Sequence, residues 1–461
     1  MAPNQRIFGV ETEYGITCAS TVGGEPPLDA ESAAEKLFEP LVKAGGSTNM
    51  FLRNGGRLYL DVGAHPEYAT AESSDLWDLL AQVRAGSEIL ADLARGTTSS
   101  LQAGGVNGRV HLFANNLDSS GNSFGCHENY LLRRRRDFRE VADSLIAFFV
   151  TRQVVAGAGD VKEGEDGGFH YIFSSRADQM HDALSSATTR ARPIINTRDE
   201  PLSDSGSFRR LHVIVGDTNV SEPTTALKVG STDLVLNAVE QGMRFADLRL
   251  KDPLKAIRDI SGDTTGQARV ETVSGQMLTA TEIQREIMSR ALRSVDLSEL
   301  SPLYQYVVDL WERGLDAVEA GDWGPVDQEL DFAIKKKLLD SYLERTGAEL
   351  GDPRVARLLL SYHDITDGLA PKLEAASLMV RLTSEEQVAA AKVLPPATRA
   401  HLRGQVVAAA EAAGRRLGVD WVNLRVEGMG TEVNLQDPFA TEDPRIDALL
   451  ETLRRQGAPG Q

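Results

Sequence analysis

The amino-acid sequence predicts an α+β protein with a large domain, whose largely antiparallel sheet is packed by helices, and a small C-terminal α/β domain. In the first quarter of the chain, consecutive strand-like segments are mixed with helical ones, which is typical of α+β folds. Residues from about 224 to 392 are then mainly helical. The pattern breaks at Pro395–Pro396, and a shorter helix–strand–helix unit follows. The expected domains are therefore residues 1–393 and residues 394–461.

Hydrophobic periodicity and capping residues define the expected elements. Alternating polar and apolar residues predict strands, and apolar residues three or four positions apart predict helices, one of them opened by Asp29. Two long segments, 157–168 and 185–208, lack periodicity and are expected to be functional or mobile loops. The expected strands are residues 6–16, 57–63, 109–116, 127–134, 209–219 and 419–426, and the expected helices are 29–45, 73–96, 137–159, several within 224–392, 397–417 and about 443–456.

Composition and charge narrow the class of protein. The chain has 461 residues, of which 41% are hydrophobic and 25% are charged, as in ordinary globular proteins. No apolar run approaches the roughly 20 residues that span a bilayer, and no export signal is visible, so we expect a cytoplasmic protein without membrane contact. Cys18 and Cys126 are too few for a disulfide framework and are expected to be reduced thiols. The formal net charge of −18 disfavours binding to nucleic acid.

One basic run, Arg133–Arg136, stands out from this acidic background. A solvated strand end or turn is sufficient to explain it. A docking site for an acidic partner or an anionic ligand is the functional alternative. The residues alone leave both interpretations open.

Several predicted strands carry unusual polar faces. Glu11 and Glu13 lie two residues apart on one strand, so their carboxylates point to the same side, roughly 6–7 Å apart. That spacing suits two divalent cations, or one cation and a polarised substrate. Any one such face is commonly just exposed to solvent, but several together favour a sheet that forms the floor of a site for Mg²⁺ and a phosphorylated ligand. The other faces are Arg57, Tyr59 and Asp61; Arg210 and His212; and Trp421, Asn423 and Arg425.

Well-known nucleotide and zinc motifs are absent from the sequence. It contains neither a P-loop nor a strand-linked dinucleotide fingerprint, and no C-x-x-C or H-E-x-x-H pattern. In "GNSFGCHENY", Gly121 and Gly125 surround a turn before His127, which is either a structural histidine or part of a site. Cys126 alternates away from His127 on a strand, which argues against a Cys–His nucleophilic pair.

Long segments of the sequence resemble the Pup–protein ligase family, that of proteasome accessory factor A. These segments are "GVETEYG", "FLRNGGRLYLDVGAHPEYAT", "GNSFGCHENYL", "SSATTRARPIINTRDEP", "RRLHVIVGDTN" and "VDWVNL". The resemblance extends over essentially the whole chain. It implies the fold of the carboxylate–amine ligases, which include glutamine synthetase: a curved antiparallel sheet packed with helices, closed on one side by a small C-terminal domain.

The resemblance also implies a reaction that uses ATP and Mg²⁺. ATP would phosphorylate the side-chain carboxylate of the C-terminal glutamate of Pup, a small acidic modifier protein. A lysine of a target protein would then attack the acyl phosphate, which marks the target for proteasomal degradation. Pup is expected to order as a helix against an apolar groove, and Arg133–Arg136 would add to a basic field that attracts it.

Individual roles follow from the positions that match the family motifs. Asp61 is implied as the catalytic residue, and a carboxylate base suits the deprotonation of an attacking lysine. His65 receives no role and is expected to make a structural hydrogen bond. The implied metal ligands are Glu11, Tyr59 and Glu67, with Glu13 and His212 added from their strand faces; the implied ATP contacts are Arg57, Thr70 and Trp421, with Arg210 added in the same way.

Three other functions remain compatible with this pattern. A Pup deamidase or depupylase has the same fold, but "TEYG" at the first motif and the direct run from "VGAHPEYATAES" into the next helix favour the ligase. A scaffold that binds Pup without chemistry would not need both Glu11 and Asp61. A small-molecule carboxylate–amine ligase would act on free glutamate and an amine without a protein modifier.

Overall fold

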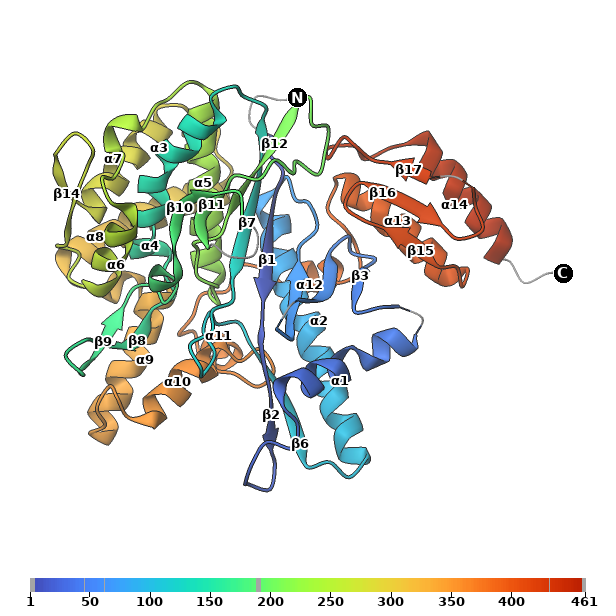
Figure 1. Ribbon diagram of the computed structural model, residues 1–461, viewed down its shortest axis with the longest axis horizontal. Helices are drawn as coiled ribbons and strands as arrows, with labels where there is room; N and C mark the ends of the chain where they lie inside the picture. Colours follow the sequence, from blue (N-terminus) through green and yellow to red (C-terminus); the bar gives the residue numbers. More distant parts are fainter. Residues whose placement is uncertain (1–4, 45, 62, 188–191, 431, 458–461) are drawn as a thin grey trace.

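The computed structural model describes residues 5–44, 46–61, 63–187, 192–430 and 432–457. An eight-stranded sheet forms the centre of the large unit (Figure 1). Its strands are β1 (Phe8–Glu13), β3 (Asn49–Phe51), β4 (Arg57–Asp61), β5 (His65–Ala69), β7 (Cys126–Arg133), β10 (Asp182–Ser185), β11 (Pro193–Asn196) and β12 (Phe208–Val213). They are ordered β10-β11-β12-β7-β1-β5-β4-β3, and all neighbours are antiparallel except β10 and β11. The prediction of a largely antiparallel sheet is confirmed.

One face of this sheet packs against helices, and the other face is left for polar side chains. Along β1, Phe8 and Val10 point into the main hydrophobic core, while Glu11 and Glu13 on the alternate positions remain partly exposed. The helices of this layer include α5, which is buried along almost its whole length. They are α2 (Leu76–Ala103), α3 (Phe138–Thr151), α4 (Gln153–Ala156), α5 (Glu222–Glu240), α6 (Pro253–Gly262), α7 (Ala280–Leu292) and α8 (Pro302–Ala320).

Shorter elements complete the large unit. The predicted helix at residue 29 is confirmed, since Asp29 caps α1 by accepting a hydrogen bond from the backbone of Ser32 at 2.8 Å. None of the described helices combines the length and the apolar composition that a membrane span requires. The remaining elements are α1 (Ala30–Lys43), β2 (Gly15–Ser20), β6 (Gly108–Phe113), β8 (Asp160–Glu163), β9 (Phe169–Ile172), η1 (Ala177–Gln179), η2 (Ala246–Leu248), β13 (Arg269–Glu271), β14 (Met277–Thr279), η3 (Gly324–Val326), α9 (Asp331–Thr346), α10 (Pro353–His363), α11 (Ala370–Ala375) and α12 (Glu385–Ala391).

The C-terminal segment forms a three-stranded sheet with two helices and has its own hydrophobic core (Figure 1). Leu402, Val406 and Leu424 are among the buried residues of that core. The domain boundary near residue 393 stays a prediction. The elements are α13 (Arg399–Ala412), β15 (Leu417–Val419), β16 (Asn423–Val426), β17 (Glu432–Asn434) and α14 (Pro444–Gly457).

Several sequence expectations are wrong in detail. The strand expected at 6–16 is interrupted at Tyr14, after which β2 leaves the main sheet and pairs with β6. The segment 157–168, expected as a loop, contributes to the hairpin β8–β9, and 185–208 contains strand β11. The helix expected to reach residue 417 ends at Ala412, because Gly414 takes a left-handed conformation with a φ of 63°.

Candidate active site

The strand register places the predicted acids in adjacent rows on the open face of the sheet. Directly opposed residues of antiparallel strands point to the same side. Glu13 on β1 lies opposite Glu67 on β5, and Glu67 lies opposite Tyr59 on β4. Two residues before Glu13 on β1, Glu11 lies opposite His127 on β7. Residues that are distant in the sequence therefore converge on one surface.

Three carboxylates form the first candidate metal group. Oxygens of Glu13, Asp61 and Glu67 all lie within 4.8 Å of one another. Burial, together with the charges of Glu11 and Glu13, raises the pKa of Glu67 to about 9. A divalent cation would offset this repulsion, and carboxylate oxygens are the donors that Mg²⁺ prefers. The donor set of the described residues therefore fits Mg²⁺.

A second candidate group combines Glu11 with two histidines. His127 Nδ1 lies 3.5 Å from Glu11 Oε2, and Asn129 Nδ2 donates to Glu11 Oε1 at 2.9 Å. Burial disfavours the charged form of Glu11, yet the hydrogen bond with His127 and the nearby His212, His127 and Arg210 hold its pKa below the ordinary value. Burial lowers the pKa of His212 to about 3, so its ring is neutral near pH 7. Its Nε2 has no hydrogen-bond partner among the described residues.

Tyr59 and Arg57 form the edge of the site on β4. The Arg57 guanidinium lies 4.2 Å from the centre of the Tyr59 ring, and its Nε donates to Asn49 Oδ1 at 2.9 Å. Burial and the charges of Glu11 and Glu67 raise the pKa of the Tyr59 phenol, which therefore stays protonated. The metal-ligand role implied for Tyr59 and the ATP contact implied for Arg57 stay predictions.

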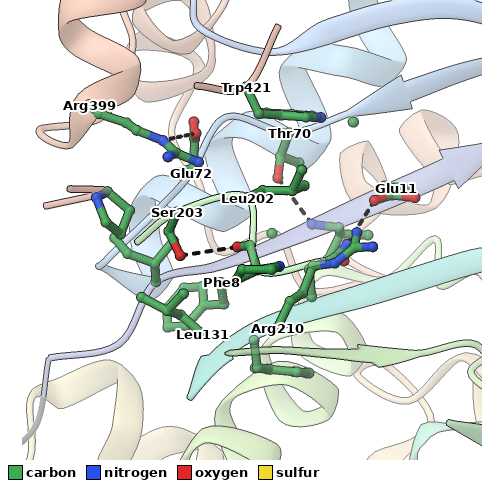
Figure 2. Close-up of a pocket in the computed structure, with 18 residues that line it drawn as sticks. Phe8, Glu11, Thr70, Glu72, Leu131, Leu202, Ser203, Arg210, Arg399 and Trp421 are labelled. Carbon is green, nitrogen blue, oxygen red and sulfur yellow. Dashed lines mark hydrogen bonds and ion pairs between the residues drawn. The ribbon is translucent and has the colours of Figure 1, made fainter. Parts of the chain in front are cut away.

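A small cavity of about 80 Å³ lies between the sheet and the C-terminal unit (Figure 2). Glu11, Thr70 and Arg210 line it from the large unit, and Arg399 and Trp421 line it from the C-terminal unit. The Thr70 hydroxyl accepts a hydrogen bond from the backbone of β1 at 3.1 Å and retains a proton to donate. The cavity thus brings together three of the four predicted ATP contacts, Thr70, Trp421 and Arg210.

Trp421 provides an aromatic wall for this cavity, where Figure 2 shows it above Thr70. Its ring packs edge-to-face against Phe51, with centroids 4.9 Å apart, and the Arg403 guanidinium lies 5.1 Å from the ring centre. Apolar side chains such as Leu202 line the same space. An aromatic surface beside apolar walls suits a nucleobase.

A buried ion-pair network, absent from the sequence prediction, joins the two units beside this cavity. Arg399 Nε donates to Glu72 Oε1 at 2.7 Å, and Arg403 Nη1 donates to the same oxygen at 3.0 Å. Burial opposes ionisation of Glu72, but the two guanidiniums lower its pKa to about 2. Glu72 and Arg399 line the cavity, so the network also fixes part of its wall.

A larger cavity of about 1320 Å³ lies beside the first candidate metal group. Its lining includes Glu13 and Asp61 of that group, and also His127. His65 also lies there; its Nδ1 is 3.2 Å from the Tyr14 carbonyl oxygen, and its ring stacks on Phe124 at 4.6 Å. The structural hydrogen bond predicted for His65 is therefore confirmed.

The remaining predicted basic residues have partners. Arg210 donates from Nη1 to Asn129 Oδ1 at 3.1 Å and from Nη2 to Glu200 Oε2 at 3.3 Å. In the basic run, Arg134 pairs with Asp199 and Arg135 pairs with Asp137. These two arginines already have structural roles, and a docking role of the run stays a prediction.

The stability of the metal-free protein should depend on Glu67. Its folded-state pKa of about 9 exceeds the ordinary 4.5, so the free energy of unfolding should fall between pH 4.5 and 9, by up to about 1.4 kcal/mol per pH unit. Mg²⁺ should reduce this slope, and Glu67→Gln should show a smaller fall in stability with pH and a weaker response to Mg²⁺. Urea unfolding at pH 5, 7 and 9 measures this, and an equal slope in the variant would contradict it.

The comparisons with known proteins agree with this geometry. The family model for the Pup-ligase protein matches residues 6–425. The Pup–protein ligase of Xylanimonas cellulosilytica is 50% identical over 459 residues, covering 98% of this chain and 100% of that protein. The Pup–protein ligase of Jonesia denitrificans is 50% identical over 457 residues, covering 98% of this chain and 99% of that protein.

Two solved structures share the fold. The complex between prokaryotic ubiquitin-like protein Pup and its ligase PafA matches with a TM-score of 0.92 and 40% identity, covering 99% of this chain and 92% of that chain. The structure of PafA in complex with ADP matches with a TM-score of 0.83 and 42% identity, covering 93% and 94%. These matches confirm the predicted α+β fold class and the family resemblance. The chain therefore belongs to the Pup-ligase family.

Proposed function

We propose that this protein, an ATP-dependent ligase of the Pup-ligase family, joins the C-terminal glutamate of Pup to lysine amines of target proteins through a glutamyl phosphate. The conjugates would be directed to proteasomal degradation, and we place the reaction in the cytoplasm. One observation carries the proposal: Glu11 of one candidate metal group lines the cavity suited to a nucleotide, and Glu13 and Asp61 of the other group line the larger cavity open to a protein substrate.

The nucleotide would occupy the smaller cavity, with its base against Trp421 and its phosphates toward Glu11 and Arg210. The PafA structure in complex with ADP supports nucleotide binding by this protein. The predicted ligands Glu11, Tyr59, Glu67, Glu13 and His212 would hold Mg²⁺. All but Tyr59 belong to the two candidate metal groups. When bound, Mg²⁺ would neutralise phosphate charge and orient the γ-phosphoryl group.

The larger cavity would receive both protein substrates. A side-chain carboxylate of Pup attacks the γ-phosphorus of ATP, and ADP leaves. The lysine nitrogen then attacks the acyl carbon, phosphate departs with the bridging oxygen, and an isopeptide bond forms. Asp61 lines this cavity and would take the proton that the lysine ammonium must lose.

The test is direct conjugation. The protein is mixed with MgATP, Pup ending in glutamate and a lysine-bearing target, and the expected result is one ADP released per covalent conjugate. Pup ending in glutamine serves as the control, because its side-chain amide has no carboxylate to phosphorylate. Release of Pup from a preformed conjugate, without conjugate formation, would instead identify a depupylase.

Trp421→Ala should weaken ATP binding while leaving Pup binding nearly unchanged. Loss of an aromatic stacking surface is worth about 1–3 kcal/mol, which corresponds to an affinity about 5- to 150-fold lower. Titration with a fluorescent ATP analogue measures the first effect, and competition with labelled Pup measures the second. Trp421→Phe, which retains a ring, should recover most of the affinity, and unchanged ATP binding in Trp421→Ala would remove the residue from the nucleotide site.

A further inference from the structure

The larger cavity contains basic side chains that the proposed reaction does not use. Its acids Glu13 and Asp61 come from β1 and β4. Its basic residues, Arg176, His181 and Arg192, come from a different part of the fold, before and between β10 and β11. One cavity therefore offers carboxylates at one place and guanidiniums at another.

Neither arginine is neutralised by a carboxylate within 4 Å in the described part of the chain. Arg176 is 1% exposed; it donates to Ser123 Oγ at 2.7 Å and to the Ile214 carbonyl at 2.8 Å, and its Nε has no partner among the described residues. Arg192 donates to the Ser123 carbonyl at 3.1 Å and to Gln179 Oε1 at 3.4 Å. Both guanidiniums thus meet at Ser123 with neutral partners only.

This arrangement differs from that of other buried arginines in the protein. Arg152 pairs with Glu128 at 2.6 Å, and Arg403 pairs with Glu72. Burial lowers the pKa of Arg176; the charges of Glu13 and Asp217 oppose this shift, and the charge of Arg192 adds to it. Two neighbouring guanidiniums that are not directly paired with a carboxylate repel each other, and an anion bound to both would offset that repulsion.

We propose that Arg176 and Arg192 bind the α-carboxylate of the C-terminal glutamate, while its γ-carboxylate extends to the Glu13 and Asp61 end of the cavity, where ATP would phosphorylate it. The inference rests on the proposed function, which places that residue in this cavity. A C-terminal glutamate carries two carboxylates, and a guanidinium binds carboxylate in a fork of parallel hydrogen bonds. An internal glutamate has a neutral peptide group in place of the α-carboxylate, so the pair would select the chain terminus.

The test uses Pup ending in glutamate and the same protein with only its α-carboxylate converted to an amide. Binding to the full-length enzyme is measured by competition with labelled Pup. Amidation should weaken binding to the unaltered enzyme about 10- to 100-fold, the range of charged hydrogen bonds. Arg192→Gln should weaken binding of unmodified Pup by a similar factor, and amidation of Pup should then cause little further loss of affinity. The affinity of Arg192→Lys for unmodified Pup should lie between those of the unaltered enzyme and Arg192→Gln.

The control variant is Arg269→Gln, which alters an exposed arginine outside this cavity and should discriminate between the two forms as the unaltered enzyme does. Equal binding of both forms by the unaltered enzyme would overturn the inference. The inference would also be overturned if amidation weakened binding to Arg192→Gln by the same factor as binding to the unaltered enzyme. Arg192 would then act on another anion, such as the transferred phosphoryl group. Conjugation is assayed in the same samples, so discrimination in binding without conjugate would support this inference and contradict the proposed function.

Discussion

Asp61→Asn should lower the rate of conjugation at least about 100-fold while ATP affinity stays within about twofold, because the amide keeps the shape of the side chain but cannot accept a proton. Asp61 lines the larger cavity and is absent from the lining of the nucleotide cavity, so binding of the nucleotide should not depend on it. Single-turnover conjugation with saturating ATP and Pup measures the chemical steps, and titration with an ATP analogue measures the affinity.

Two further measurements make this result specific. Asp316→Asn removes an exposed carboxylate outside both cavities, and its conjugation rate should match that of the unaltered enzyme. Because the charge of Asp61 contributes to the raised pKa of Glu67, the Mg²⁺ dependence of the variant is measured as well. Normal turnover of Asp61→Asn at saturating Mg²⁺ would refute the assignment of Asp61 as the base.

Glu72→Gln should destabilise the protein by about 3–5 kcal/mol, since it leaves the guanidiniums of Arg399 and Arg403 buried without a counter-charge. The variant should also bind ATP more weakly, because Glu72 and Arg399 line the nucleotide cavity. Urea unfolding followed by circular dichroism measures the stability, and an ATP analogue titration under native conditions measures the affinity.

The effect of Glu72 should depend on pH in a defined direction. The pKa of Glu72 is lowered from 4.5 to about 2. Its contribution to the free energy of unfolding is therefore fully present above about pH 4.5 and is lost as the pH falls toward 2. The difference in unfolding free energy between the unaltered protein and Glu72→Gln should therefore be constant near pH 7 and decrease in acid. Glu411→Gln breaks the exposed pair with Arg53, which also bridges the two units, and should cost less than about 1 kcal/mol. An equal loss of unfolding free energy in Glu72→Gln and Glu411→Gln would contradict the stabilising role of the buried Glu72 network.

Much of the sheet face could be predicted because the alternation of a strand is a local property. It placed Glu11 with Glu13, Tyr59 with Asp61, and Arg210 with His212, and each pair lies on one strand of the main sheet. The side chains gathered around them could not be derived in this way. His127 faces Glu11 only because β7 pairs with β1, and strand order across more than 100 residues leaves no local signal.

Two other features show where sequence patterns were insufficient. Trp421 was expected on a strand face, but the Asp420 side chain accepts hydrogen bonds from the backbone of Val422 and Asn423 at 2.7 Å, which forms a turn and delays β16 until residue 423. The Glu72 network joins residues more than 300 positions apart. Buried ion pairs of this kind depend on how the two units pack, and the sequence around each residue does not indicate that packing.

In the proposed reaction, a carboxylate of Pup becomes an acyl phosphate before the amine attacks. The most direct measurement uses Pup whose C-terminal glutamate carries ¹⁸O in both γ-carboxylate oxygens. We expect one labelled oxygen in the released phosphate for each conjugate formed, because the attacking carboxylate oxygen leaves bound to phosphorus. Conjugate formation with unlabelled phosphate would contradict it.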